Sequence, residues 1–277
     1  MSVKKYLNQI ESYKGRTIVL LGGTSGIGLK LIEHLVSKEA KVILFAKNIN
    51  KANEIKEQYK ENIIDVIKYD QSSFESIDKS INELLSKHQD FDSIVLNVGV
   101  LNEKRILESG YPATIGINYI GARYFIDQIS PKLSHKVRFV IQGSCTAGIK
   151  LKRKVDFKAK KLGKFAQYNI SKGYLEAYFY KLYTENKYQN IEYVLTEPGI
   201  TGTKITRHLN PVVRFLGVGF LFLFFHHARK ASLTLLRGLS SQSKNGDYII
   251  PRGPLTFSGL PKTKPFPEKR KRPFLFE

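Results

Sequence analysis

The chain has 277 residues, 42% of them hydrophobic, which is enough for one large globular domain. Its single cysteine, Cys145, excludes an intramolecular disulfide and a cysteine-built metal cluster, and the spacing of its six histidines predicts no dedicated metal site. The formal net charge of +21 indicates a negatively charged partner such as phosphate, an acidic lipid surface or nucleic acid, although a solvated basic surface is the simpler interpretation.

The N-terminal stretch, Met1–Tyr13, is of mixed polarity and lacks the apolar core of a secretory signal. Because a lone cysteine also suits a reducing compartment, we expect a cytoplasmic protein. The next segment, Thr17–Leu21, is a short apolar run rich in β-branched residues. Glycines follow it at once, and then come apolar residues at helical spacing from Leu31 to Val36, so the pattern predicts a strand, a glycine turn and a helix.

Short apolar runs separated by helical segments continue along the chain. The runs that we interpret as further strands are 42–45, 63–68, 94–96, 137–141, 191–195 and 248–250. Charged or periodic segments near 50–60, 74–85 and 165–185 predict helices. Strands that alternate with helices at this pace indicate an α/β fold, a doubly wound parallel sheet with helices on both faces. In such sheets ligands lie beyond the carboxyl ends of the strands.

The glycine turn after the first strand is suited to a phosphate group. Gly22, Gly26 and Gly28 let the backbone turn tightly and approach a pyrophosphate, while the start of the helix supplies N–H groups and a positive dipole end. The spacing Gly-x-x-x-Gly-x-Gly differs from the common dinucleotide pattern and from a P-loop, and glycines required only for a tight turn are the alternative. The predicted cofactor-binding residues of this turn are Gly22, Thr24, Ser25, Gly26, Ile27 and Gly28.

The residue after the second strand discriminates between NAD and NADP. An acidic residue there would bind the ribose 2′-hydroxyl of NAD, whereas this chain has Lys47. Lys47 therefore predicts NADP as the cofactor rather than NAD, with a solvated surface lysine as the alternative. Asp70, after the third strand, is expected to accept a hydrogen bond from the adenine amine or else to cap the following helix.

Tyr168 and Lys172 stand one turn apart in a segment predicted to be helical, so they project from one face. A neighbouring ammonium favours phenolate over phenol, and lowering the pKa of a tyrosine from ~10 to near neutrality takes about 4 kcal/mol. We therefore expect Lys172 to lower the pKa of Tyr168, which then exchanges a proton with a carbonyl or alcohol oxygen. The pair alone is weak evidence, because the chain holds 15 tyrosines and 45 lysines and arginines.

These motifs occur in the order found in the short-chain dehydrogenase/reductase family, and the chain resembles that family from Gly15 to Thr203. The residues that carry the resemblance are Gly22, Gly26 and Gly28, Asn97-Val98-Gly99, Asn118, Ser144, Tyr168 and Lys172, and Pro198-Gly199. The resemblance implies a single-domain Rossmann-type fold and the NAD(P)-dependent interconversion of alcohols and carbonyls.

The resemblance also implies a role for each of four catalytic residues. Tyr168 is implied as the acid/base, and Lys172 as the residue that lowers its pKa and binds the nicotinamide ribose. Ser144 is implied to hydrogen-bond the substrate oxygen, and Asn118 to help hold a water that relays protons through Lys172. A proton donor beside a hydroxyl suits a reaction that creates or consumes a negative oxygen. Further implied cofactor-binding residues are Asn97, Gly99, Pro198, Gly199 and Thr203.

The chain departs from the family pattern around Ser144. An alignment shifted by one position puts Cys145 in its place; we favour Ser144, which keeps the register of the preceding strand, and interpret Cys145 as a small packed residue. The gap from Ser144 to Tyr168 is longer than in most members. A similar insertion, with a stretch like Val155-Asp156-Phe157, occurs in the branch that resembles retinol dehydrogenases, which indicates a lipophilic substrate.

We place the oxidoreductase domain at residues 1–259, with a variable substrate lid at about 204–230 and a basic, proline-rich tail at 260–277. Phe215–Phe225 contains only Phe, Leu, Val and Gly, and it is too short to span a bilayer, which takes about 20 residues. We expect this segment to be an apolar lid or buried, with insertion into a membrane interface as the alternative. The tail is predicted to be extended and partly disordered.

We therefore expect an NADP(H)-dependent oxidoreductase that acts on a lipophilic alcohol, aldehyde or ketone. The alternative is a non-catalytic NADP(H)-binding protein whose basic surface engages a polyanion, but a binding module has no need for Tyr168 and Lys172 together. We expect a small-molecule substrate and no nucleic acid partner, and we leave a peripheral membrane contact open. Tyr174, Tyr178 and Phe179 predict either a helix that packs on a second subunit of a homo-oligomer or part of the core.

Overall fold

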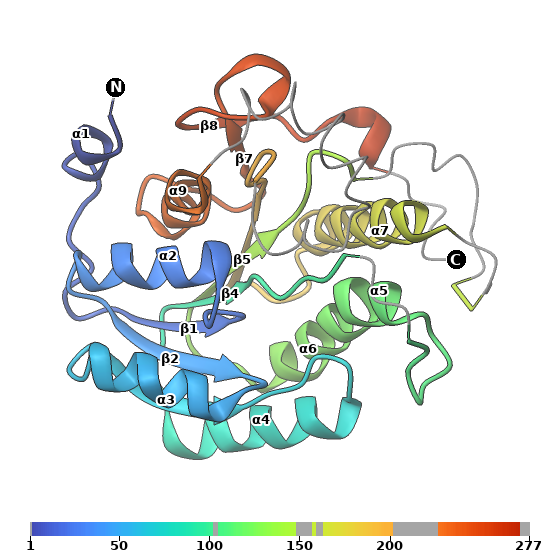
Figure 1. Ribbon diagram of the computed structural model, residues 1–277, viewed down its shortest axis with the longest axis horizontal. Helices are drawn as coiled ribbons and strands as arrows, with labels where there is room; N and C mark the ends of the chain where they lie inside the picture. The colour runs from blue at the N-terminus through green and yellow to red at the C-terminus, as the bar shows by residue number, and fades with distance from the viewer. Residues whose placement is uncertain (1, 102–104, 148–156, 159–162, 202–226, 272–277) are drawn as a thin grey trace, which may run out of the picture.

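An eight-stranded sheet forms the centre of the protein (Figure 1). The structure is a computed structural model that describes residues 2–101, 105–147, 157–158, 163–201 and 227–271. The strands are β1 (Thr17–Leu21), β2 (Lys41–Ala46), β3 (Ile63–Lys68), β4 (Ser93–Leu96), β5 (Val137–Gln142), β6 (Ile191–Thr196), β7 (Tyr248–Pro251) and β8 (Pro261–Lys264). Their order is β3-β2-β1-β4-β5-β6-β7-β8, with parallel pairing from β3 to β7 and an antiparallel β8. The predicted parallel α/β sheet is confirmed.

Helices cover both faces of this sheet (Figure 1). On one face pack α2 (Gly26–Val36), α3 (Ile49–Gln58) and α9 (Ala228–Leu239), and on the other pack α4 (Phe74–Lys87), α6 (Ala122–Ile129) and α7 (Lys164–Glu185). The remaining helical segments are α1 (Val3–Leu7), α5 (Ala113–Ile115), the π-helix η1 (Gly116–Gly121), and the short 3-10 helices η2 (Ser130–Lys132), η5 (Pro254–Thr256) and η6 (Glu268–Arg270). The arrangement is therefore doubly wound, as the alternation of strands and helices predicts.

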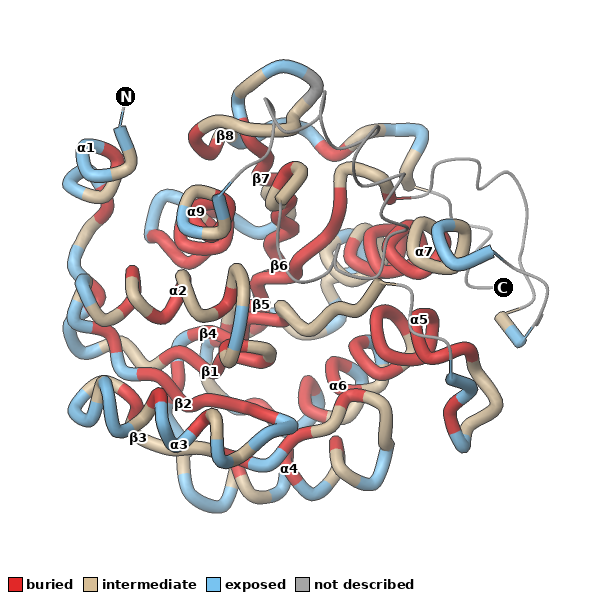
Figure 2. The backbone as a smooth tube through the Cα atoms, viewed as in Figure 1, coloured by how far each residue is buried: buried red, intermediate tan, exposed pale blue. Residues whose placement is uncertain are grey.

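The hydrophobic core is divided by the sheet into two layers. In β1, Val19 and Leu21 belong to one layer, and the alternate residues Ile18 and Leu20 belong to the other. Figure 2 shows that most residues of the central strands are buried. A strand with a helical layer on each side has no solvent-facing side chains, which explains why these strands are continuous apolar runs. The α7 residues Tyr174, Tyr178 and Phe179 are likewise buried within this chain, so they form part of the core.

The strand order reverses at β1, and this reversal fixes the position of the predicted site. β1 pairs with β2 on one side and with β4 on the other. In open α/β sheets ligands bind beyond the carboxyl ends of the strands at such a point. Gly22 directly follows β1 and Asn97 directly follows β4, so two predicted cofactor-binding residues meet there.

The C-terminal part of the chain differs from the sequence-based expectation. β8 lies beyond the predicted domain boundary at residue 259 and pairs with β7 through registers such as Tyr248 with Lys264. Its residues, Pro-Lys-Thr-Lys, carry no apolar alternation, and edge strands tolerate both Pro and Lys, so the sequence pattern contains no signal for it. Residues 204–226 of the predicted lid lie outside the described residues. Among the residues that are described, none of the helices combines the length and apolarity needed to cross a membrane.

Side chains of the N-terminal segment donate hydrogen bonds to carbonyl oxygens at the C-terminal end of α9. Tyr13 is fully buried, and its hydroxyl donates to the Leu236 carbonyl oxygen at 2.9 Å. The Arg16 Nη1 atom donates to the Leu239 carbonyl oxygen at 2.8 Å. The last carbonyls of a helix have no partner within the helix, so these two side chains supply the missing donors. The start of the chain thereby anchors α9 on the sheet.

We predict that Tyr13→Phe lowers the free energy of unfolding by about 1–3 kcal/mol, because it leaves the buried Leu236 carbonyl without its donor. Urea unfolding followed by circular dichroism measures the change. Tyr59→Phe is the matched control, since the Tyr59 hydroxyl accepts a hydrogen bond from Gln58 at the exposed surface. Equal losses in the two variants would contradict the anchoring role of Tyr13.

Candidate active site

The predicted phosphate turn, 22–28, joins β1 to α2. Gly22 has a φ of +85°, and a Cβ atom there would lie 2.9 Å from the Val98 nitrogen. A Cβ atom on Gly28 would lie 2.1 Å from the Gly22 carbonyl oxygen, so glycine alone fits this close approach. The Asn97 Nδ2 atom donates to the same carbonyl oxygen at 2.8 Å. The end of β4 is thereby tied to the turn.

α2 begins at this turn without a side-chain cap. Its N-cap residue, Ser25, forms no side-chain cap hydrogen bond. The first N–H groups of a helix lack acceptors within the helix, so an uncapped end presents donors and a positive dipole to an anion. The other predicted residues of the turn are Thr24, Gly26 and Ile27, which lie beside Ser25. The turn therefore fits a pyrophosphate.

Lys47 and Asp70 form an ion pair beyond the ends of β2 and β3. The Lys47 Nζ atom is 2.6 Å from the Asp70 Oδ2 atom, and the Lys47 side chain is 59% exposed. Burial raises the pKa of Asp70, but the hydrogen bonds from Lys47 and Ser72 outweigh it and hold the pKa below its usual range. The cap of α4 is Ser73, whose hydroxyl accepts from the Ser76 nitrogen at 3.2 Å. The alternative that Asp70 caps this helix is therefore wrong.

Tyr168 lies near the start of α7, and its side chain is hydrogen-bonded to the side chain of Ser144, which follows β5. Burial raises the pKa of Tyr168 to about 12; the Ser144 hydrogen bond lowers it, whereas Cys145, Glu176 and Glu197 raise it further. Desolvation of the phenolate is the largest influence on this pKa, which lies above its usual value, whereas the prediction was a value below it. The catalytic roles of Ser144 and Tyr168 stay predictions.

The Lys172 ammonium is buried at the end of β5, one turn along α7 from Tyr168. Its Nζ atom donates to the Gln142 carbonyl oxygen at 2.7 Å. Burial lowers the pKa of Lys172 to about 8, and the Glu176 carboxylate opposes that shift. A Cβ atom on Gly99 would lie 3.6 Å from the Lys172 Nζ atom, so the absence of a side chain at Gly99 leaves the ammonium approachable from the end of β4.

Asn118 lies in the π-helix η1, and its side chain holds the segment after β4. The Oδ1 atom accepts from the Val100 nitrogen at 2.8 Å, and the Nδ2 atom donates to the Val100 carbonyl oxygen at 2.8 Å and to the Ser171 hydroxyl at 3.1 Å. Ser171 precedes Lys172, so Asn118 connects the segment after β4 to α7. Its part in a proton relay stays a prediction.

Pro198 and Gly199 follow β6 and turn toward the segment that leads into β8. Gly199 has a φ of +74°, and a Cβ atom there would lie 2.3 Å from the Phe257 carbonyl oxygen. The Ile200 nitrogen donates to the same oxygen at 2.9 Å. Thr203, the last residue predicted for this loop, lies outside the described residues.

Two buried acids and one arginine at this site escape prediction from the sequence. Glu176 lies one helical turn after Lys172, and Glu197 directly precedes Pro198; Arg270 forms ion pairs with both acids. An acid within a buried apolar run is a readable signal for Glu176 and Glu197. Arg270 carries no local signal, because its partners are distant in the sequence.

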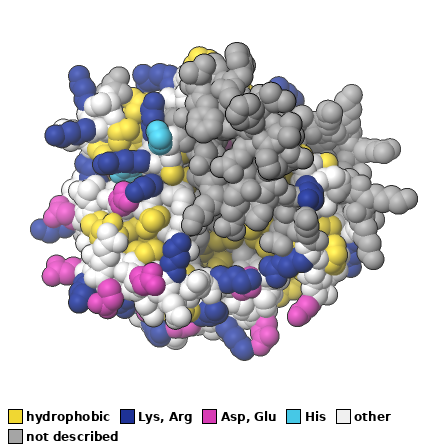
Figure 3. All heavy atoms as spheres, in the orientation of Figure 1, with side chains coloured by type: hydrophobic (Ala, Val, Ile, Leu, Met, Phe, Trp, Pro, Cys, Tyr) yellow, Lys and Arg dark blue, Asp and Glu magenta, His cyan; other side chains and the backbone are white. Residues whose placement is uncertain are grey.

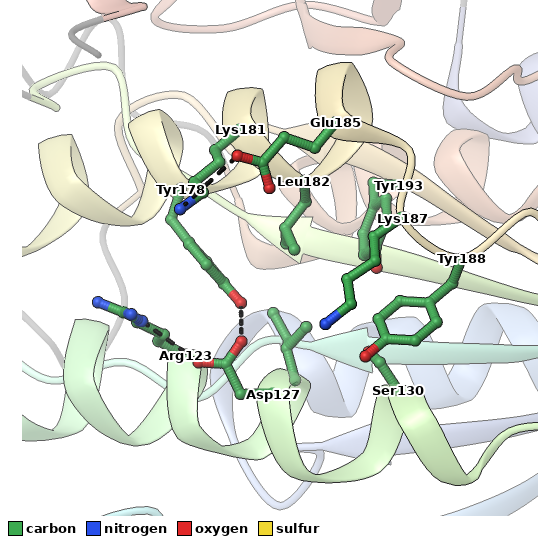
Figure 4. Close-up of a pocket in the computed structure, with 11 residues that line it drawn as sticks. Arg123, Asp127, Ser130, Tyr178, Lys181, Leu182, Glu185, Lys187, Tyr188 and Tyr193 are labelled. Atoms are coloured by element: carbon green, nitrogen blue, oxygen red, sulfur yellow. Dashed lines mark hydrogen bonds and ion pairs between the residues drawn. The ribbon is translucent and has the colours of Figure 1, made fainter. Parts of the chain in front are cut away.

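A cavity of about 220 Å³ lies between α6 and the C-terminal half of α7 (Figure 4). In its wall the Tyr178 hydroxyl donates to Asp127, and the Arg123 Nε atom donates to the same carboxylate at 3.3 Å. The lining residues are Arg123, Ile126, Asp127, Ser130, Tyr178, Lys181, Leu182, Glu185, Lys187, Tyr188 and Tyr193. The cavity contains none of the predicted site residues, so it is separate from the predicted active site.

Lys and Arg side chains are spread over the face shown in Figure 3, with Asp and Glu side chains among them. Several of the acids pair with lysines along a helix, as Glu75 does with Lys79 at 2.6 Å and Glu83 with Lys87 at 2.5 Å. Both signs of charge are therefore mixed on this face, and the solvated basic surface stays the simpler interpretation of the net charge.

The chain is similar to known oxidoreductases along most of its length. Residues 16–213 match the short chain dehydrogenase family. A short-chain dehydrogenase/reductase of Armillaria gallica is 26% identical over 265 residues, which cover 88% of this chain and 84% of that protein. A solved structure of an uncharacterized protein from Mycobacterium paratuberculosis has a TM-score of 0.75 at 17% identity and covers 96% of this chain and 90% of its own. A gluconate 5-dehydrogenase from Burkholderia cenocepacia, solved with NADP and tartrate, has a TM-score of 0.65 at 16% identity and covers 80% of this chain and 86% of its own.

We predict that Lys172→Met removes a group that titrates near pH 8. The cofactor-free wild type is therefore expected to release about one more proton than the variant between about pH 7 and about pH 9. Because the pKa is depressed in the folded state, stability is also expected to rise in the wild type, relative to the variant, as the pH increases through about 8. Potentiometric titration and urea unfolding measure the two effects. Identical titration curves would contradict the assignment.

Proposed function

This chain belongs to the short-chain dehydrogenase family, whose members are oxidoreductases of CH–OH groups, and on that premise we propose that it interconverts a lipophilic alcohol and its carbonyl with NADP(H). Tyr168 is the acid/base of this proposal. The observation that carries it is the placement of Tyr168 and Lys172 one helical turn apart on α7, with the Lys172 ammonium buried and donating to the Gln142 carbonyl oxygen at the end of β5, two residues before Ser144.

The described residues fit a nicotinamide dinucleotide. The uncapped end of α2 and the close glycine turn before it suit the pyrophosphate, and Lys47 suits a 2′-phosphate. Gly99 leaves room beside the Lys172 ammonium, which suits the nicotinamide ribose. When bound, the cofactor supplies or accepts the hydride. The contribution of the protein is to orient the two reactants and to move a proton.

In the reductive direction of the proposed reaction, Tyr168 donates the proton. With a pKa of about 12, Tyr168 is protonated at neutral pH and is therefore a proton donor to a carbonyl oxygen. Ser144 is placed to hydrogen-bond the same oxygen, because its hydroxyl already contacts the phenol. With a pKa of about 8, Lys172 also carries its proton at neutral pH, so its charge stabilises the phenolate that proton donation leaves behind.

NADP is supported by the charge balance after β2. Lys47 is exposed and pairs with Asp70, so the acid that follows β3 is neutralised rather than free to repel a 2′-phosphate. The structurally similar gluconate 5-dehydrogenase was solved in complex with NADP. A lipophilic substrate is supported by the apolar sequence of Phe215–Phe225, in the region predicted to form the substrate lid.

We predict that Tyr168→Phe lowers turnover by about 10²- to 10⁴-fold, because it removes the proton donor, while NADPH binding is retained. Turnover is measured on the carbonyl of a broad panel that the wild type reduces fastest, and binding by the fluorescence of NADPH. Tyr180→Phe, in the same helix, is the control and is expected to retain activity. A Tyr168→Phe variant with wild-type turnover would exclude the proposed acid/base.

We predict that Lys47→Gln weakens NADP binding by about tenfold, since one charge-assisted hydrogen bond to the 2′-phosphate is lost. NAD binding is expected to be unchanged, because NAD lacks that phosphate. Isothermal titration calorimetry with both cofactors measures the ratio, and Lys51→Gln, a charge change in the adjacent helix α3, is the control. Equal weakening of both cofactors would argue against recognition of the 2′-phosphate by Lys47.

A further inference from the structure

The C-terminal segment places a partly buried arginine at the proposed active site. Arg270 ends the 3-10 helix η6, and its side chain is only 16% exposed. Its Nη1 atom donates to the Glu176 Oε2 atom at 2.9 Å and to the Glu197 Oε1 atom at 2.5 Å. Tyr248 joins this cluster, because its hydroxyl lies 3.1 Å from the same nitrogen and 2.5 Å from Glu197. Side chains from α7, from the residue after β6 and from β7 thereby contact one guanidinium group.

The other oxygen of Glu176 contacts the backbone of a proposed catalytic residue. The Oε1 atom accepts from the Ser144 nitrogen at 3.0 Å. A Cβ atom on Gly143 would lie 2.6 Å from this oxygen, so the glycine lets the carboxylate approach the strand end. The Arg270 Nη2 atom also reaches the Cys145 carbonyl oxygen at 3.5 Å. Residues 143–145 are therefore held from two sides.

Glu176 continues the catalytic face of α7. Tyr168, Lys172 and Glu176 are spaced by one helical turn each, so their side chains follow one another along one face. Tyr168 contacts the Ser144 side chain, and Glu176 contacts the Ser144 backbone. The position of Ser144 relative to Tyr168 is thus set by the same helix at two points.

The two acids require the arginine. Glu176 is 0% and Glu197 1% exposed, and removing a partner from buried carboxylates leaves charge without compensation. Burial raises the pKa of Glu176, and the Arg270 guanidinium opposes that shift. Its planar fork contacts several acceptors at once, which the single ammonium of a lysine does less well.

We propose that Arg270 is a positioning residue for Ser144: through Glu176, Glu197 and the Cys145 carbonyl it fixes residues 143–145 against Tyr168, so that the C-terminal segment completes the active site. This inference rests on the proposed function, since it gives Ser144 a catalytic role. The immobilisation itself is a structural statement, and it is testable without substrate or cofactor.

Cys145 is the reporter for this test, because it is the single cysteine of the chain. Burial and Glu197 raise the pKa of its thiol, while Arg270 lowers it. Loss of the Arg270 charge alone would raise the pKa of the thiol and so slow the alkylation of Cys145. Release of residues 143–145 would expose the thiol and so accelerate it. We expect Arg270→Met to be alkylated by iodoacetamide about tenfold faster than the wild type at a fixed, mildly alkaline pH.

Lys271→Gln is the matched control, because Lys271 pairs with the exposed Glu268 in the same segment. It is expected to keep the wild-type alkylation rate. A second variant, Arg270→Ala, is expected to be alkylated fast without additive. Millimolar guanidinium chloride is expected to slow its alkylation again, since the guanidinium ion can occupy the position of the missing side-chain group. If Arg270→Met does not fold, Arg270→Lys serves instead, with an intermediate rate. A rate equal to or slower than that of the wild type in a folded Arg270 variant would overturn the proposal.

The catalytic consequence is measured separately. On a carbonyl that the wild type reduces, Arg270→Met is expected to lower kcat about tenfold and to leave NADPH binding unchanged. If Arg270→Met is alkylated faster than the wild type but the wild type reduces no carbonyl, Arg270 does immobilise residues 143–145 and the proposed function is wrong. If Arg270→Met is alkylated at the wild-type rate and the activity of the wild type depends on Tyr168, the proposed function holds and the positioning role of Arg270 is wrong.

Discussion

Burial of two titratable side chains on one face of α7 is the constraint on which the rest of the site depends. Lys172 and Glu176 are both buried, and each is satisfied by groups from outside the helix: Lys172 by the Gln142 carbonyl, and Glu176 by the Ser144 nitrogen and Arg270. Because an unpaired buried charge is strongly destabilising, the helix, the end of β5 and the C-terminal segment have to assemble together. The geometry around Tyr168 follows from this assembly.

Burial also shifts the pKa values of Tyr168 and Lys172. A lysine one turn from a tyrosine suggests a lowered phenol pKa, yet in this chain desolvation is the largest influence on the pKa of Tyr168 and raises it. Tyr168 therefore stays protonated at neutral pH, while the pKa of Lys172 falls to about 8. A protonated phenol near a protonated amine can give a proton to a carbonyl oxygen, which is the role that the proposed reduction requires of Tyr168.

The strands that form continuous apolar runs could be predicted from the sequence. The runs at Thr17–Leu21 and Ile63–Lys68 are strands with the predicted ends. Thr17–Leu21 is a central strand that is apolar because it is buried on both faces, whereas Ile63–Lys68 is the edge strand β3 and is only partly buried. β8 was missed, since an edge strand can be Pro-Lys-Thr-Lys. Ser144 beside Tyr168 was predictable from motif order, whereas Arg270 was not: it lies 94 positions from Glu176, and only the folded chain brings them together.

The account stands on one claim, that this chain reduces a carbonyl with a proton from its own tyrosine and a hydride from NADPH. The most direct measurement is the stoichiometry of the reaction, with NADPH consumed and alcohol formed followed together across a panel of lipophilic aldehydes and ketones. The account predicts equal amounts of the two for at least one member of the panel. A protein that binds NADPH yet converts none of these carbonyls would contradict it.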